Sequence, residues 1–127
     1  MARILLAEDE EALRALTARA LTDSGHEVAT AVDGADALDI VAWENGQFDL
    51  LLTDIRMPLM DGIALALSVA RDYPRIIIPL MTAYADQRER ASNLDALIHD
   101  VILKPFTLAE IKAAVNEALR ASKRRAG

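Results

Sequence analysis

Residues 50–62 read LLLTDIRMPLMDG, three leucines that lead through Thr53 and Asp54 into a loop containing Pro58 and Gly62. An aliphatic run without polar alternation predicts a strand that is covered on both faces, as the strands of parallel sheets are. A carboxylate at the end of a buried strand is costly unless a cation or hydrogen-bond donors offset its lost hydration. The segment therefore predicts a central strand with a functional group, Asp54, at its carboxyl end.

The whole chain contains five aliphatic runs of this kind, and each is separated from the next by enough residues for one helix. The runs span residues 3–7, 26–31, 48–54, 75–82 and 97–103. Strands that alternate with helices favour a parallel sheet joined by helical crossovers. The expected fold is an α/β, doubly wound (βα)5 domain, and in the flavodoxin-like form of that topology its five-stranded parallel sheet has the order 2-1-3-4-5.

The segments between the runs carry apolar residues at helical spacing. The expected core positions of the four clearest helices are Leu13, Leu16, Ala20 and Leu21; Leu38, Val41 and Ala42; Ile63, Leu67 and Ala70; and Leu108, Ile111, Val115 and Ala118. Thr107 and Glu110 predict a capping box at the start of the last helix. A further helix within residues 85–96 is mostly polar, so we expect it to pack lightly.

The composition excludes several classes of site and partner. The 127-residue chain has no cysteine, so neither disulfides nor thiolate metal sites can form. Its net charge of −6 disfavours direct binding to nucleic acid or to anionic lipid surfaces. The N-terminal aliphatic stretch is too short for a signal peptide or a membrane span. We therefore expect a cytoplasmic protein.

Acidic residues follow two of the predicted strands. Glu8 and Asp9 come directly after the first strand, and Asp54 ends the third. In a doubly wound sheet the carboxyl ends of these two neighbouring strands meet where ligands bind. Three carboxylates that lie close together must protonate one member, move apart or hold a cation, and a set of oxygen ligands selects a hard ion such as Mg²⁺. The sequence thus predicts a magnesium site made by these three residues.

Two more chemically useful side chains end the remaining strands. Thr82 closes the fourth aliphatic run and Lys104 closes the fifth, so both are expected at the same edge of the sheet. Together with a metal ion, an ammonium and a hydroxyl suit a phosphoryl group that is attached to a carboxylate. Asp54 would then be the nucleophile that receives it.

Four motifs make this sequence resemble the receiver domain of bacterial two-component response regulators. They are AEDE at 7–10, LLLTDIRMPLMDG at 50–62, MTAYAD at 81–86 and LKPF at 103–106, and the likeness covers practically the whole chain. The resemblance implies that Asp54 accepts a phosphoryl group from the phosphohistidine of a histidine kinase or phosphotransferase. The expected boundaries are a receiver domain at 1–121 and a short basic tail at 122–127, with no output domain.

The resemblance also implies a specific arrangement around Mg²⁺. Asp9 and Asp54 would bind the ion directly, the backbone carbonyl of Arg56 would be a third protein ligand, and Glu8 would act mainly through water. On phosphorylation, Thr82 and Lys104 would move toward the phosphoryl oxygens. The peptide bond between Lys104 and Pro105 is expected to be cis, as it usually is in this family.

Three positions are expected to modulate the switch. Val101 stands where receivers usually carry an aromatic residue, and an aliphatic side chain cannot undergo the same ring swing. Tyr84, two residues after Thr82, either takes over part of that coupling or is an ordinary surface residue. Arg56 and Tyr84 also occupy the positions that flank the phosphoryl group in the family, where we expect them to shield it from water.

The sequence leaves several downstream functions open. In receivers the responsive surface is formed by the fourth helix, the fifth strand and the fifth helix, here roughly residues 86–121. We expect a signalling domain that is not an enzyme and that passes its state on by protein contact. The sequence most resembles single-domain cell-cycle receivers that help deliver substrates to a AAA+ protease. A phosphorelay intermediate, a motor-type binder and, less favoured, a magnesium-dependent aspartyl-phosphate phosphatase are the alternatives.

Overall fold

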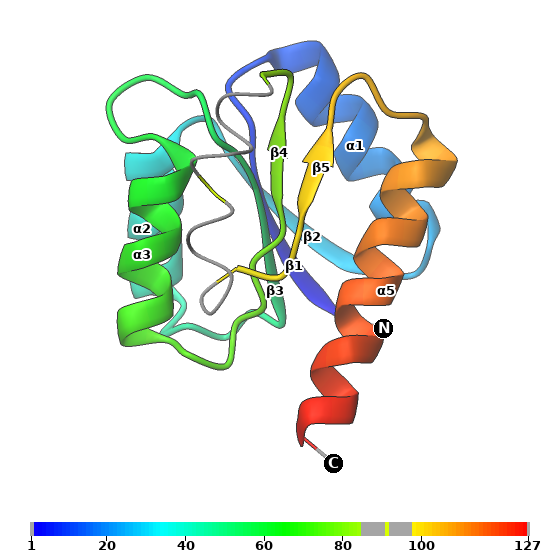
Figure 1. Cartoon of the computed structure of the whole chain (residues 1–127). Helices are drawn as coiled ribbons and strands as arrows, with labels where there is room; N and C mark the ends of the chain where they lie inside the picture. Colours follow the sequence, from blue (N-terminus) through cyan, green and yellow to red (C-terminus); the bar gives the residue numbers. More distant parts are fainter. Residues whose placement is uncertain (1, 85–90, 92–97, 127) are drawn as a thin grey trace.

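The computed structural model describes residues 2–84, 91 and 98–126, which form a parallel sheet between two layers of helices (Figure 1). The elements are β1 (Arg3–Ala7), α1 (Glu11–Asp23), β2 (Glu27–Ala31), α2 (Gly34–Trp43), β3 (Leu50–Asp54), α3 (Gly62–Asp72), β4 (Leu80–Thr82), β5 (Val101–Leu103) and α5 (Leu108–Ala126). The sheet has five parallel strands in the order β2-β1-β3-β4-β5. The predicted fold class and strand order are therefore confirmed.

The core consists of two apolar layers, one on each face of the sheet. Figure 1 shows α2 and α3 on one face and α1 and α5 on the other. Alternate residues of β1 and β3 serve the two layers: Leu5 and Leu51 face α2 and α3, whereas Ile4 and Leu52 face α1 and α5. All five residues of β3 are buried, as the unbroken aliphatic run predicts for a strand covered on both faces.

β2 and β3 begin one and two residues later than expected, at Glu27 and Leu50, and the last two strands are shortened more. The fourth was predicted over 75–82, but β4 begins at Leu80, and before it only Ile77 forms an isolated bridge, to Leu50. Pro79 explains the interruption, because it has no N–H group to donate to the neighbouring strand. The fifth was predicted over 97–103 and begins at Val101. Leu97 lies outside the described residues.

The helices form where expected but turn slightly different faces to the core. The predicted core positions Leu16, Leu67 and Leu108 are exposed, by 54%, 42% and 43% respectively. Ala42 is exposed as well. In α1 the buried stripe passes through Thr17 instead, and in α3 it passes through Leu65 and Ala66. Leu16, Ala42 and Leu67 each lie next to a buried residue of their helix, whereas Leu108 is the first residue of α5.

The predicted helix boundaries largely hold. Thr107 and Glu110 form the expected capping box, because each side chain accepts a hydrogen bond from the other residue's N–H group. The side chain of Asp61 caps α3 by accepting from the N–H of Ala64. The expected boundary between the domain and a basic tail, at 121/122, falls inside α5, which continues to Ala126.

The helix expected within 85–96 falls almost entirely outside the described residues, so the prediction that it packs lightly stays a prediction. Of that segment only Ala91 is described, and it is buried in the layer that faces α2 and α3. Across the described part of the chain, every helix is too short or too polar to cross a membrane.

Candidate functional site

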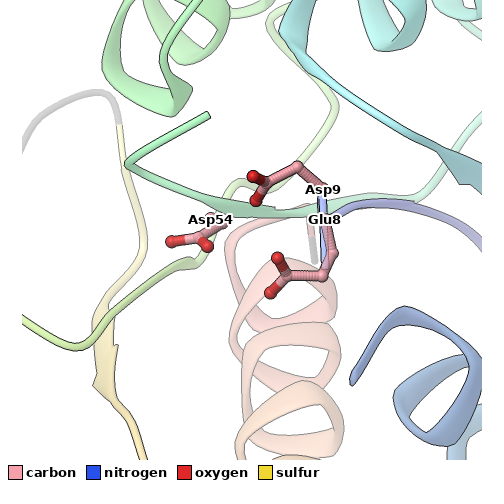
Figure 2. Close-up of side chains that lie close together, drawn as sticks. All are labelled: Glu8, Asp9 and Asp54. Atoms are coloured by element: carbon pink, nitrogen blue, oxygen red, sulfur yellow. The ribbon is translucent and has the colours of Figure 1, made fainter. Parts of the chain in front are cut away.

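The carboxyl ends of β1 and β3 bring Glu8, Asp9 and Asp54 together, as Figure 2 shows. One carboxylate oxygen from each residue lies within 4.8 Å of the others. Glu8 and Asp54 are buried, being 1% and 7% exposed, whereas Asp9 faces solvent. The predicted acidic cluster therefore exists, and it offers an ion an open side at Asp9.

Lys104 joins the cluster from the end of β5. Its Nζ donates hydrogen bonds to Glu8 Oε1 at 2.6 Å and to Asp54 Oδ2 at 2.8 Å. The three partners come from positions up to 96 residues apart. One ammonium thus bridges two buried carboxylates, which explains how the strand end at Asp54 tolerates a charge.

Close backbone packing fixes the position of Asp54. The N–H of Gly62 donates to the carbonyl oxygen of Ile55 at 2.7 Å, so the loop returns directly beside the end of β3. A Cβ at position 62 would lie 2.0 Å from the backbone oxygen of Asp54. Glycine is therefore required there by the close approach of the two backbone segments.

Thr82 is fully buried at the end of β4, beside the cluster in the strand order. Its hydroxyl accepts a hydrogen bond from the N–H of Tyr84 at 3.1 Å, and its carbonyl accepts one from the N–H of Lys104 at 2.8 Å. The backbones of the two predicted phosphoryl-binding residues are thus tied together. The hydroxyl can still donate its own hydrogen.

The residues predicted to modulate the phosphorylation switch lie in three different parts of the structure. The guanidinium of Arg56 lies over the ring of Tyr84, with its carbon 4.4 Å from the ring centre. Tyr84 is 46% exposed, so this pair stands at the solvent boundary. Val101 packs against the core layer that faces α2 and α3. The peptide bond between Lys104 and Pro105 is cis, as predicted.

The charges of the cluster shift two pKa values. The pKa of Asp9 lies above its ordinary value of 3.8, because neighbouring groups displace water from its carboxyl and because Glu8 lies beside it. Burial lowers the pKa of Lys104, but the hydrogen bonds from Lys104 to Asp54 and Glu8 outweigh this effect and leave its pKa raised. The ionised form of Asp9 is therefore disfavoured, whereas the charged form of Lys104 is favoured.

This donor set suits a divalent cation. Three carboxylates and one ammonium leave two formal negative charges in the cluster. All of the ligand atoms are oxygens, and Mg²⁺ commonly takes one or two carboxylates while it keeps water or phosphate oxygens in its other positions. Residues Glu8, Asp9 and Asp54 therefore fit a Mg²⁺ ion.

The raised pKa of Asp9 predicts that Asp9→Asn stabilises the metal-free protein. A carboxyl whose pKa is higher in the folded state contributes stability below its unfolded pKa and loses that contribution as pH rises through the folded pKa. We expect the variant to unfold at a higher temperature than the parent at pH 7 in EDTA. The difference should shrink as the pH falls toward 3.8, the ordinary pKa of Asp9.

In the presence of Mg²⁺ the parent should instead unfold at a higher temperature than Asp9→Asn. At about 100 times its dissociation constant, an ion stabilises the protein that binds it by roughly 2.7 kcal/mol, and the variant lacks one ligand. Calorimetric unfolding of parent and variant, in EDTA and in MgCl₂, measures both effects. A variant that gains as much from Mg²⁺ as the parent would show that Asp9 is not a ligand.

Two contacts of the site have no equivalent in the sequence-based prediction. Arg14 of α1 donates from Nη1 to the backbone oxygen of Glu8 at 2.9 Å. The stacking of Arg56 on Tyr84 is the other. Arg56 and Tyr84 belong to two of the quoted motifs, but their contact with each other depends on how the segments after β3 and β4 approach in space. Arg14 belongs to no quoted motif, and its contact depends on the path of the loop between β1 and α1.

Comparison with known proteins places the chain among signalling domains. The family model described as response regulator receiver domain matches residues 4–116. Transcriptional regulatory protein PrrA of Mycobacterium tuberculosis is 37% identical over 118 residues, which are 93% of this chain and 50% of that protein. Response regulator MprA of Mycobacterium avium is 35% identical over 121 residues, which are 95% of this chain and 52% of that protein. The chain spans about half the length of these curated relatives.

Solved structures agree with the fold. A CheY-like receiver domain protein from Methanospirillum hungatei superposes with a TM-score of 0.89 at 27% identity, covering 98% of both chains. Response regulator TrrA from Thermotoga maritima, solved in complex with Mg²⁺ and BeF, gives a TM-score of 0.81 at 31% identity. That match covers 93% of this chain and 99% of the other.

Proposed function

Because this chain belongs to the response regulator receiver domain family and is a phosphoacceptor signalling domain, we propose that Asp54 is the residue that accepts the phosphoryl group. The donor would be the phosphohistidine of a histidine kinase or phosphotransferase. A lone pair of an Asp54 carboxylate oxygen attacks the phosphorus, and the phosphorus–nitrogen bond breaks with its electron pair going to the imidazole. The product is an aspartyl phosphate.

The surrounding residues would stabilise the charge of the transferred group. Glu8, Asp9 and Asp54, with the backbone carbonyl of Arg56, would hold Mg²⁺, which neutralises negative charge on phosphoryl oxygens when it is bound. Lys104 already donates to Asp54 Oδ2 and can redirect that hydrogen bond to a phosphoryl oxygen. The hydroxyl of Thr82 can donate to another.

One observation supports this proposal more than any other. The Lys104 ammonium lies 2.8 Å from Asp54 Oδ2, at the end of a buried strand, within a cluster of three carboxylates. A purely structural ion pair would need a single carboxylate partner. Three carboxylates beside one ammonium exceed that need, and they suit a divalent ion beside a nucleophile.

The direct test uses acetyl phosphate, a small acyl phosphate donor, so that no partner protein is needed. Purified protein incubated with acetyl phosphate and Mg²⁺ should gain the mass of one phosphoryl group in intact mass spectrometry. The same incubation with EDTA should give little or none. Folded protein that gains no mass in either buffer would contradict the proposed function.

The pair of Arg56 and Tyr84 is expected to slow hydrolysis of the phosphoryl group by limiting the approach of water. A guanidinium on an exposed aromatic ring is worth about 0.5 to 1 kcal/mol. The variant Arg56→Ala, Tyr84→Ala should therefore lose the phosphoryl group about two to five times faster than the parent. The decay of phosphorylated protein, followed by intact mass after removal of the donor, measures this rate.

Tyr84→Phe is the matched control, because it keeps the ring face under Arg56 and removes only the hydroxyl. It should dephosphorylate at close to the parental rate. If the double alanine variant also loses its phosphoryl group at the parental rate, the two side chains do not shield the site.

We further propose that phosphorylation changes the binding of a partner protein at the face formed by residues 86–121. Among the described members of this face, β5 carries Lys104 at its end, so a change at Asp54 reaches the strand directly. PrrA is named as a transcriptional regulatory protein and MprA as a response regulator, and neither name supports a protease partner. The AAA+ protease adaptor, the phosphorelay intermediate and the cytoplasmic location stay predictions.

A pull-down with and without beryllofluoride, which mimics the phosphoryl group, would distinguish these outputs. Capture of a protease or its unfoldase in one state only would favour the adaptor, and a histidine phosphotransferase alone would favour the relay. The phosphatase alternative has less support, because enzymes of that kind typically need a second aspartate two residues after the nucleophile. Arg56 occupies that position here.

A further inference from the structure

We propose that Arg14 is a positioning residue, which sets the direction of the two acidic side chains that follow β1 and thereby sets the affinity for Mg²⁺. This inference rests on the proposed function. Arg14 lies in the first turn of α1, and its guanidinium is partly buried against the loop between β1 and α1. Its Nη1 donates to the backbone oxygen of Glu8 at 2.9 Å.

The bonded oxygen belongs to the peptide group between Glu8 and Asp9. The N–H of Glu8 is held separately, by the backbone oxygen of Ala31 at 3.1 Å. Together the two contacts hold the peptide groups on both sides of Glu8, which restricts rotation of the backbone between the two acidic residues. Without Arg14, the peptide group before Asp9 could rotate and carry that carboxylate away from Asp54.

The side chain of Glu8 does not replace this restraint. Its Oε1 accepts from Lys104, and its Oε2 accepts from the N–H of Glu10 at 3.1 Å. Both contacts hold the Glu8 carboxylate, and neither acts on the peptide group that precedes Asp9. Arg14 therefore restrains the more exposed acidic residue of the cluster from the α1 side.

A positioning role and a purely electrostatic role predict opposite results. Arg14 is a positive charge near the cluster, so its removal by itself would make the site more attractive to a cation. If Arg14 positions the loop, its removal weakens Mg²⁺ binding despite that gain. Contacts that orient metal ligands typically change affinity by about 10- to 100-fold.

Isothermal titration with MgCl₂ can separate the two roles. We expect Arg14→Met to raise the dissociation constant about tenfold or more. Arg14→Gln, which keeps an N–H donor without the charge, should recover part of the affinity. Arg19→Met is the matched control, since Arg19 is an exposed arginine of α1 with no hydrogen bond or ion pair to any described residue. Its affinity should stay within about twofold of the parent.

Amide hydrogen exchange in the metal-free protein gives a second readout. The amides of residues 8–10 should exchange faster in Arg14→Met and Arg14→Gln than in the parent, more so in the former, while those of β3 should be unchanged. Unchanged or tighter Mg²⁺ binding by Arg14→Met would overturn the inference. If that variant does not fold, parental affinity and exchange in Arg14→Gln and Arg14→Lys together would overturn it. Failure of the parent to bind Mg²⁺ would instead contradict the proposed function.

Discussion

Asp54→Asn is expected to abolish phosphorylation while leaving the protein folded. The amide has nearly the same shape as the carboxylate, so the buried end of β3 keeps its packing. An amide oxygen is a much weaker nucleophile than a carboxylate, and the variant also lacks one of the three carboxylates of the proposed Mg²⁺ site. Intact mass after incubation with acetyl phosphate and Mg²⁺ should show no added phosphoryl group.

The control for this prediction is Asp39→Asn, which makes the same chemical change on the exposed side of α2. It should be phosphorylated like the parent. Circular dichroism of Asp54→Asn should match that of the parent, so that loss of the adduct can be assigned to chemistry. Phosphorylation of Asp54→Asn at the parental rate would mean that another side chain is the acceptor.

Lys104→Met is expected to cause the largest loss of stability. Glu8 and Asp54 are buried and both lie within hydrogen-bonding distance of this ammonium. Removing one partner of a buried ion pair leaves unpaired charge in a poorly hydrated site and typically costs about 3 to 5 kcal/mol. Urea unfolding in EDTA should show a decrease of this size in the free energy of unfolding.

Two further variants test the cause of that loss. Glu8→Gln combined with Lys104→Met should recover part of the stability, because fewer charges then remain unpaired. Lys112→Met in α5 should lower the free energy of unfolding only slightly, since Lys112 makes no ion pair or hydrogen bond with the described residues. A loss below about 1 kcal/mol in Lys104→Met would show that the pair is hydrated like a surface salt bridge.

The sequence predicts most of the fold because its aliphatic runs and its helical spacing are strong signals. The run at 50–52 predicts β3 in the centre of the sheet, and the alternation of strands and helices predicts that the sheet is parallel. The order of the strands does not follow from the alternation and was expected from flavodoxin-like topology. The predicted start of β4 was wrong. Ile76 is buried, as a strand residue would be, but Pro79 interrupts the hydrogen bonding between the strands. Apolar periodicity shows burial, whereas strand pairing also needs backbone donors.

The acidic cluster was predictable for a topological reason. Residues that end parallel strands lie at one edge of the sheet, so Glu8, Asp9 and Asp54 had to approach one another once the strand order was known. The bridge made by Lys104 and the contact made by Arg14 were not predictable in this way. They depend on side-chain conformations and on loop positions, which leave no periodic signal in the sequence.

The central claim is that the phosphoryl group is carried by Asp54, and borohydride reduction tests it most directly. Borohydride converts an aspartyl phosphate to homoserine, which stays in place during digestion and can be located by peptide mass spectrometry. After treatment with acetyl phosphate and Mg²⁺, homoserine is predicted at position 54. Homoserine at position 9 alone, the corresponding reduction product at Glu8 alone, or no reduced residue in protein that has gained a phosphoryl group would contradict the claim.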